Sequence, residues 1–287
     1  WAHGTRCNYA EAAQAAGRAV VEARISEDHR QRRRAASQYA VACLYGPMPV
    51  AEAIQQCEEI VAEAGADRRT IGLVTSLLAR LYAMRGDFDE ARRLYAKARI
   101  TLEEMGRSVI ASSTSLDSCG VEMLAGEPAA AERELRRDFD ALTAMGERYV
   151  LSTIAAELAR AIDAQRRHEE ALDLTRVAED LSAEDDITSQ ALWRVVRGKT
   201  LAEQGKRREA LALTSEGLDL LRQTDATVVR DEGLADVAEV MRLCGDPDAA
   251  RELLREALGL LERKGNVVKA ATVRSALETL DASTAPA

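Results

Sequence analysis

Apolar residues recur every three or four positions through most of this chain, and short turns interrupt them at regular intervals. The pattern is clearest around Gly86–Ala91, where Leu77–Tyr82 leads in and Leu94–Ala98 leads out. A spacing of three to four residues places apolar side chains on one face of an α-helix. The sequence therefore predicts a helix, a glycine turn and a second helix in this segment.

The same unit returns along the chain with a period near 40 residues. Aligned on the alanine that follows the turn, the copies fall at Ala91, Ala131, Ala171, Ala210 and Ala250, with weaker copies at Ala53 and Ala12. Five positions before that alanine, four of the five best copies carry glycine and the fifth carries Arg166. Glycine fits there because a helix commonly ends in left-handed backbone, which other residues adopt at a cost. We therefore expect Arg166 to reduce the stability of its turn.

These repeats predict pairs of helices without an intervening linker. The leading helices are expected near 30–45, 70–85, 108–125, 148–165, 187–204 and 228–244. The trailing helices are expected near 8–25, 50–64, 88–105, 128–145, 168–182, 207–223 and 247–264, followed by a capping helix near 267–281. We predict one domain over residues 1–282 and a disordered tail over 283–287.

The spacing of small and aromatic residues within a unit resembles the tetratricopeptide repeat: Ala79, Tyr82, Gly86, Ala91, Tyr95 and Ala98. One helix pair cannot bury its own apolar face, so stability must come from stacking of neighbouring units. The predicted fold is all-α: a right-handed superhelical solenoid of about seven tetratricopeptide-like helix pairs with a C-terminal capping helix. Its leading helices are expected to line the concave face.

Composition narrows the function classes. The formal net charge of −9 argues against direct nucleic-acid binding, because phosphate contacts need a basic surface. No apolar run is long enough to span a membrane, so no membrane partner is expected. The cysteines, at positions 7, 43, 57, 119 and 244, are odd in number and irregular in spacing. They predict neither a disulfide framework nor a zinc site, and they favour a reducing, cytoplasmic location.

We find no catalytic, metal or cofactor motif in the sequence. Gly198-Lys199-Thr200 resembles part of a phosphate-binding loop, but Trp193 stands where the first glycine of that motif would be. The string also lies inside a predicted helix, whose backbone amides are already bonded. We interpret His168 as an exposed residue in the first turn of a trailing helix, and Trp193 as a packing residue. The sequence therefore favours a protein that is not an enzyme.

The concave face is the better candidate for binding. The position eleven before the aligned alanine should point into the groove, and it carries Arg80, Arg160 and Lys199. Arginine offers a planar fork of donors suited to carboxylate or phosphate. The groove would then hold an acidic or extended peptide segment, or these cations would pair with acids of adjacent repeats. Other residues expected in the groove are Gln38, Tyr45, Ser76, Asp163, Glu203, Glu239 and Arg242.

Four segments occur in an order that resembles a known family: Tyr45–Val50, Gly126–Leu135, Gln190–Arg194 and Glu262–Val267. They are similar to the C-terminal tetratricopeptide-repeat region of large bacterial signalling proteins. The resemblance implies an actinobacterial source. In that family a class III adenylate/guanylate cyclase domain precedes an AAA-type ATPase module and then the repeats. Similar arrays end some LuxR-type ATPase regulators. Neither the cyclase nor the ATPase domain is present in these residues.

The resemblance implies a non-catalytic regulatory scaffold that binds a peptide, a partner protein or a neighbouring ATPase or cyclase domain in its groove. The alternative is a sensor of a small anionic metabolite. The chain begins at Trp1 and its first repeat lacks most of a leading helix, so we expect a piece of a larger protein. The apolar end left by that repeat leaves a homodimer open.

Overall fold

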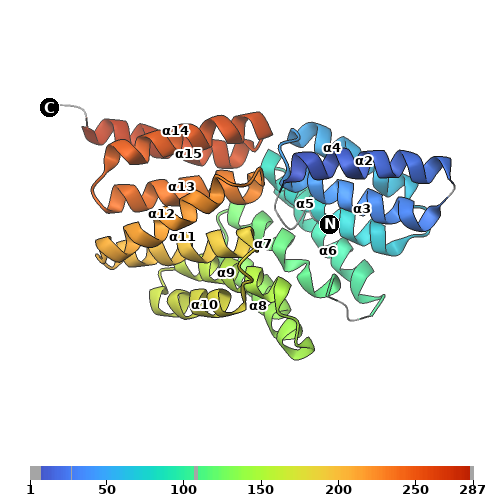
Figure 1. The fold of residues 1–287 in the computed structure, drawn as a ribbon, viewed down its shortest axis with the longest axis horizontal. Coiled ribbons are helices and arrows are strands. Elements are labelled where there is room, and N and C mark those ends of the chain that lie inside the picture. Colours follow the sequence, from blue (N-terminus) through green and yellow to red (C-terminus); the bar gives the residue numbers. More distant parts are fainter. Residues whose placement is uncertain (1–7, 27, 107–108, 285–287) are drawn as a thin grey trace.

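The computed structural model describes residues 8–26, 28–106 and 109–284, and every regular element in these ranges is a helix (Figure 1). The elements are α2 (Tyr9–Ile25), α3 (His29–Tyr45), α4 (Val50–Glu63), α5 (Arg68–Arg85), α6 (Phe88–Glu103), the 3-10 turn η1 (Ala111–Ser113) and α7 (Ser115–Leu124). They continue with α8 (Pro128–Met145), α9 (Tyr149–Asp163), α10 (His168–Leu181), α11 (Ile187–Glu203), α12 (Arg207–Leu221), α13 (Thr227–Leu243), α14 (Pro247–Lys264) and α15 (Val267–Thr284). The predicted all-α repeat solenoid is confirmed.

The repeat positions behave as the alignment predicted. The six aligned alanines from Ala53 to Ala250 are all buried. The turn glycines Gly86, Gly126, Gly205 and Gly245 have left-handed backbone, with φ between 77° and 93°. Arg166 adopts the same conformation with φ of 64°, and no other non-glycine residue in the described ranges has a positive φ.

Three details differ from the predicted boundaries. The helix expected near 108–125 begins only at Ser115, because the hydroxyls of Ser113 and Thr114 bond to nearby carbonyls and hold a tighter turn. At the N-terminus, α3 packs more extensively on α2 than on its expected partner α4. At the C-terminus, α15 extends to Thr284, so the expected disordered tail is helical at residues 283–284, and 285–287 lie outside the described residues.

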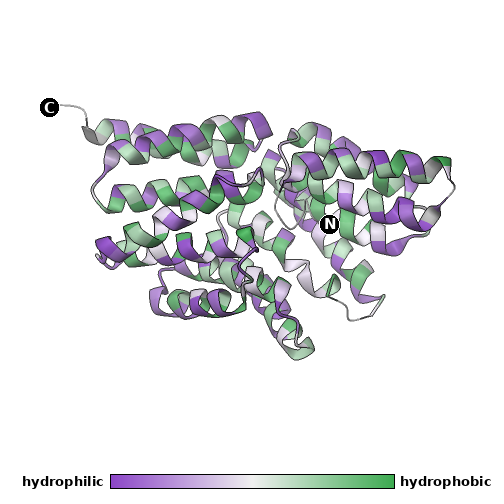
Figure 2. Ribbon diagram, in the orientation of Figure 1, coloured by the Kyte–Doolittle hydropathy of each residue, from purple (hydrophilic) through white to green (hydrophobic). Residues whose placement is uncertain are grey.

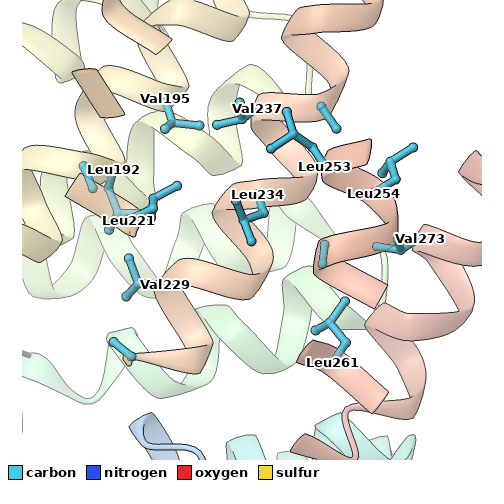
Figure 3. Packing of buried hydrophobic residues seen from close by; sticks show 14 of the residues in the cluster. Leu192, Val195, Leu221, Val229, Leu234, Val237, Leu253, Leu254, Leu261 and Val273 are labelled. Atoms are coloured by element: carbon cyan, nitrogen blue, oxygen red, sulfur yellow. The ribbon is translucent and has the colours of Figure 1, made fainter. Parts of the chain in front are cut away.

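Successive helix pairs share their apolar faces. Hydrophilic and hydrophobic residues are interspersed along each helix (Figure 2). This spacing gives a helix an apolar face that can pack on its neighbours. The largest apolar cluster joins α11 to α15, and Figure 3 shows its side chains meeting between these helices. Among them are Leu192, Leu221, Leu234, Leu253, Leu261 and Val273. The array is therefore stabilised by contacts between units, as in other solenoids.

The superhelix curves until its two ends meet, and Figure 1 shows α2–α4 beside the ends of α13–α15. Lys264, the last residue of α14, is only 2% exposed. Its Nζ donates to the carbonyl oxygens of Cys43, Gly46 and Met48 at 2.9, 2.7 and 2.8 Å. These carbonyls lie at the C-terminus of α3 and just beyond it, where the helix leaves acceptors unpaired and favours a cation.

Further polar and apolar contacts join the same elements. Thr227 at the start of α13 donates its hydroxyl to the carbonyls of Tyr45 and Gly46, both at 3.2 Å. The carboxylate of Asp225 accepts the first backbone amides of α2. Val228 of α13 belongs to the apolar cluster of α3–α6. We call this set, together with Lys264, the end-to-end interface.

The first prediction tests this interface. Replacing Lys264 with Met keeps the aliphatic stem but removes the ammonium that donates to three carbonyls, of which Gly46 keeps a second donor in Thr227. We expect the free energy of unfolding to fall by about 1–3 kcal/mol, since unpaired buried acceptors are costly. Urea unfolding measures this change. The neighbouring exposed Arg263→Met is the control, and equal effects of the two substitutions would contradict the assignment.

A second prediction follows from the protonation of Lys264. Burial lowers its pKa to about 8, whereas an unfolded lysine titrates near 10.4. Between these values the unfolded chain binds a proton that the native chain lacks, so stability rises with pH by about 1.4 kcal/mol per unit. The Lys264→Met variant lacks this contribution. The stability difference between the two proteins should therefore widen from about pH 8 to pH 10, and a constant difference would refute it.

Candidate functional site

A buried cluster of charges occupies the centre of the concave face. It joins Arg80 of α5, Arg160 of α9 and Glu232 of α13, helices that belong to three different repeats. Both terminal nitrogens of Arg160 donate to Glu232 Oε2 at 3.1 Å, and Arg80 Nη2 lies 3.6 Å from Glu232 Oε1. One carboxylate thus holds two guanidinium groups. We call these three residues the central ion cluster.

A glycine on α7 leaves the space that the side chain of Arg80 occupies. Gly120 of α7 lies against the guanidinium of Arg80, and a Cβ there would come within 2.5 Å of Nε. Arg80 Nη1 also donates to the carbonyl of Leu116 at 3.1 Å. Arg160 Nε lies 3.1 Å from Glu157 on its own helix. A glycine at this groove position therefore admits a long cationic side chain from the preceding repeat.

Mutual pairing keeps these groups charged despite burial. Burial acts to raise the pKa of Glu232, but Arg160 and Arg80 outweigh it and the net shift is downward. Burial is the largest single influence on Arg80 and opposes its charge, but the combined attraction of Glu232 and other nearby groups, Glu157 among them, raises its pKa. By contrast, burial dominates at Asp117, whose pKa is raised although Ser76 donates to it at 2.6 Å.

A second group of charges follows along the same face. Lys199 Nζ lies 3.7 Å from both Asp163 Oδ2 and Asp236 Oδ1. The attraction of Asp236 raises the pKa of Lys199, and Lys199 in turn helps to lower the pKa of Asp236 against the effect of burial. Thr200, next in sequence, donates its hydroxyl to Asp163 Oδ1 at 2.8 Å. The Gly198-Lys199-Thr200 string therefore lies within α11 and serves contacts between repeats.

Several of the expected groove residues are buried in contacts with other repeats and are not accessible to a ligand in the groove. Arg80 is 3% exposed and faces Glu232 instead of an open groove, because the array closes on itself. Ser76 is buried against Asp117, and Tyr45 stacks on Tyr9 with ring centroids 5.5 Å apart. Gln38 is exposed on α3. Their role in ligand binding stays a prediction.

Of the two hypotheses for the groove cations, pairing describes this closed form. That hypothesis named Asp163 among the acids that would pair with the groove arginines, and in the structure Asp163 pairs with Lys199. The partner of Arg80 and Arg160 is Glu232, which we did not predict. The available signal was the group of acids at positions 231, 232, 236 and 239 in the helix near 228–244, which was expected to line the concave face.

The open part of the concave face is a cavity of about 1010 Å³ between α13, α14 and α15. Leu254, Val273 and Leu280 give it apolar walls. Its charged lining is Asp236, Glu239, Arg242 and Lys269, so two of the predicted groove residues lie there. Arg242 and Glu239 form a two-pronged ion pair at 2.7 and 2.6 Å. We call this space the C-terminal cavity.

The structure also shows the surroundings of Trp193, His168 and the cysteines. Trp193 is buried, as expected for packing, and the guanidinium groups of Arg194 and Arg197 lie 4.1 and 4.4 Å from its ring centroid. His168 begins α10 as expected, but its side chain is only 24% exposed and lies against Asp163 and Glu203. The cysteines of the described residues are free thiols. None of the described helices is long and apolar enough to cross a membrane.

Comparison with known proteins agrees with this architecture. Residues 72–97 and 233–256 match the tetratricopeptide repeat family. These segments contain the two turns at Gly86 and Gly245, and the second also contains Asp236, Glu239 and Arg242. The chain is an all-α solenoid of tetratricopeptide-like repeats. A search of curated protein sequences found no match.

Several solved structures share the fold at low identity. BtubC (BKLC) from P. vanneervenii is 18% identical with a TM-score of 0.54, over 74% of this chain and 90% of that one. A Rap protein complexed with competence and sporulation factor is 11% identical with a TM-score of 0.59, over 87% and 75%. A signal transduction ATPase from Pyrococcus horikoshii with a tetratricopeptide repeat sensor is 15% identical with a TM-score of 0.51, over 96% and 44%. At these identities the likeness shows the fold alone.

The third prediction concerns the central ion cluster. Glu232→Gln leaves two buried guanidinium groups without their shared counter-charge. We expect the free energy of unfolding to fall by about 3–5 kcal/mol, the usual cost of breaking a buried ion pair from one side. Glu239→Gln on the same helix removes an exposed pair and should cost less than about 1 kcal/mol. Denaturant unfolding compares the two variants, and similar losses would disprove the central position of Glu232.

Proposed function

We propose that the chain is a non-catalytic regulatory scaffold that binds a peptide or a segment of a partner protein in the C-terminal cavity. The single observation that carries this proposal is the cavity itself. Its volume of about 1010 Å³ exceeds that of most small-molecule sites, which range from about 300 to 1,000 Å³. Its apolar walls and charged rim suit a segment that buries one or two apolar side chains between polar ones.

The charges of the cavity favour a peptide over a small anionic metabolite. Asp236 and Glu239 balance Arg242 and Lys269, so the lining has no net positive charge. Arg242 is already paired with Glu239, and Asp236 with Lys199. A metabolite anion would have to displace these carboxylates, whereas an apolar side chain needs only the walls formed by Leu254, Val273 and Leu280.

A regulatory role follows from where the cavity lies. Its α13 wall also carries Glu232 of the central ion cluster, and its α15 wall begins three residues after Lys264 of the end-to-end interface. A segment that separates α13 from α15 would therefore disturb both closing contacts. A ligand shifts such an equilibrium by its difference in affinity for the closed and open forms. Binding in the cavity would in this way be passed to the N-terminal helices.

The sequence resemblance suggests what receives this signal. We propose that the repeats regulate an ATPase or cyclase domain of a larger bacterial protein, in the cytoplasm. Support comes from the order of the four resembling segments and from the fold shared with the sensor of a signal transduction ATPase. The Rap protein, which shares the fold, is complexed with competence and sporulation factor in its own structure.

The fourth prediction tests the cavity as a peptide site. Peptides selected from a random phage-displayed library on the wild-type chain should lose affinity at least about tenfold for Ala276→Trp, because one tenfold step corresponds to about 1.4 kcal/mol. Ala276 lines the cavity and is exposed on α15. Ala271→Trp places the same side chain at an exposed position of α15 outside the cavity lining and should bind normally.

The selected peptides are measured by isothermal titration against both variants. Equal affinity for Ala276→Trp and wild type would overturn the cavity as the site. A thermal stabilisation by anionic metabolites that Ala276→Trp abolishes, with no peptide selected, would favour the sensor alternative.

A further inference from the structure

Three side chains with metal-binding atoms converge at the junction of α9, α10 and α11. Asp163 is the last residue of α9, His168 the first of α10, and Glu203 the last of α11. One ligand atom from each lies within 4.8 Å of the other two. They come from two successive repeats, and Asp163 and Glu203 are 40 positions apart in the sequence. The fold alone brings them together.

The separations between these atoms match a coordination shell. His168 Nδ1 lies 3.2 Å from Asp163 Oδ1 and 3.3 Å from Glu203 Oε2. Zinc binds imidazole nitrogen and carboxylate oxygen at about 2.0–2.2 Å with tetrahedral geometry, which places neighbouring ligand atoms roughly 3.3–3.5 Å apart. The two separations that involve His168 therefore match a zinc shell, and the atoms of Asp163 and Glu203 lie within 4.8 Å of each other.

Glu203 supplies a second, independent observation. Its Oε2 is buried, and among the described residues it has no hydrogen-bond partner. The nearby imidazole nitrogen is within ion-pair distance but is directed to Asp163 Oδ1, with which it makes a hydrogen bond. A buried carboxylate oxygen without a donor is costly. A cation between Glu203 and His168 would satisfy it.

Residues around the three candidate ligands contact Asp163, as the outer shell of a metal site contacts its ligands. Thr200 donates to Asp163 Oδ1 at 2.8 Å, and Lys199 lies 3.7 Å from the other oxygen, Oδ2. Outer partners of this kind orient ligating carboxylates. Lys199 is shared with Asp236, so Asp163, Glu203, Asp236 and Lys199 together keep a negative charge near His168. That balance favours a divalent cation.

We propose that Asp163, His168 and Glu203 bind a zinc-like divalent ion, independently of the C-terminal cavity. The ion would take the place of the hydrogen bond at His168 Nδ1, with the imidazole proton on Nε2. Three protein ligands leave one tetrahedral position for water or for a ligand from a partner. Because the ligands come from two repeats, the ion would clamp α9 and α10 to the end of α11.

The experiment uses zinc alone on the full 287-residue chain under reducing conditions. Isothermal titration should give one site, and His168→Asn and Glu203→Gln should each weaken zinc binding at least tenfold. Glu169→Gln, an exposed carboxylate next to His168, is the matched control and should stay within twofold of wild type. Far-UV circular dichroism checks that every variant remains folded.

Cobalt substitution separates this site from the cysteines. A cobalt-loaded chain should show the visible absorption of a tetrahedral nitrogen–oxygen site without a thiolate charge-transfer band, and His168→Asn should lose that absorption. A thiolate band, unchanged zinc affinity in His168→Asn and Glu203→Gln, or no binding by the folded wild type would each overturn the proposal.

Discussion

The carboxylate of Glu232, held by Arg80 and Arg160, is the interaction on which the centre of this solenoid depends. The three charges come from α5, α9 and α13, so their meeting joins helices of three different repeats. Removing Glu232 leaves two buried guanidinium groups without their shared counter-charge, and such a penalty exceeds the value of most exposed pairs. The cluster therefore makes the superhelix specific as well as compact.

Closure at the ends follows from the curvature of the superhelix. The ammonium of Lys264 supplies donors to the C-terminus of α3, as a capping residue of that helix would, but from the opposite end of the chain. A solenoid whose repeats contact only their neighbours gains stability unit by unit. Here long-range contacts are added, so the first and last repeats are coupled. The concave face is consequently divided into a filled centre and an open C-terminal cavity.

The two proposed sites use different consequences of this arrangement. The C-terminal cavity, the proposed peptide site, lies between α13, α14 and α15, and α15 also packs against α5. The Asp163–His168–Glu203 junction lies at a turn between repeats, where helix ends gather polar groups. Its turn also contains Arg166, the one non-glycine residue of the described ranges with a positive φ.

The sequence predicted the repeat, its aligned alanines and most helix boundaries to within a few residues, the late start of α7 at Ser115 being the exception. These depend on local periodicity and on glycine at helix ends, which act over a single helix pair. It also placed Lys199 and Asp163 among the groove residues. The contacts of Lys199 with Asp163, of Arg80 with Glu232, of Lys264 with α3 and of His168 with two carboxylates are visible only in the folded chain. Those contacts depend on the small rotation between repeats, which accumulates along the array and leaves no local pattern in the sequence.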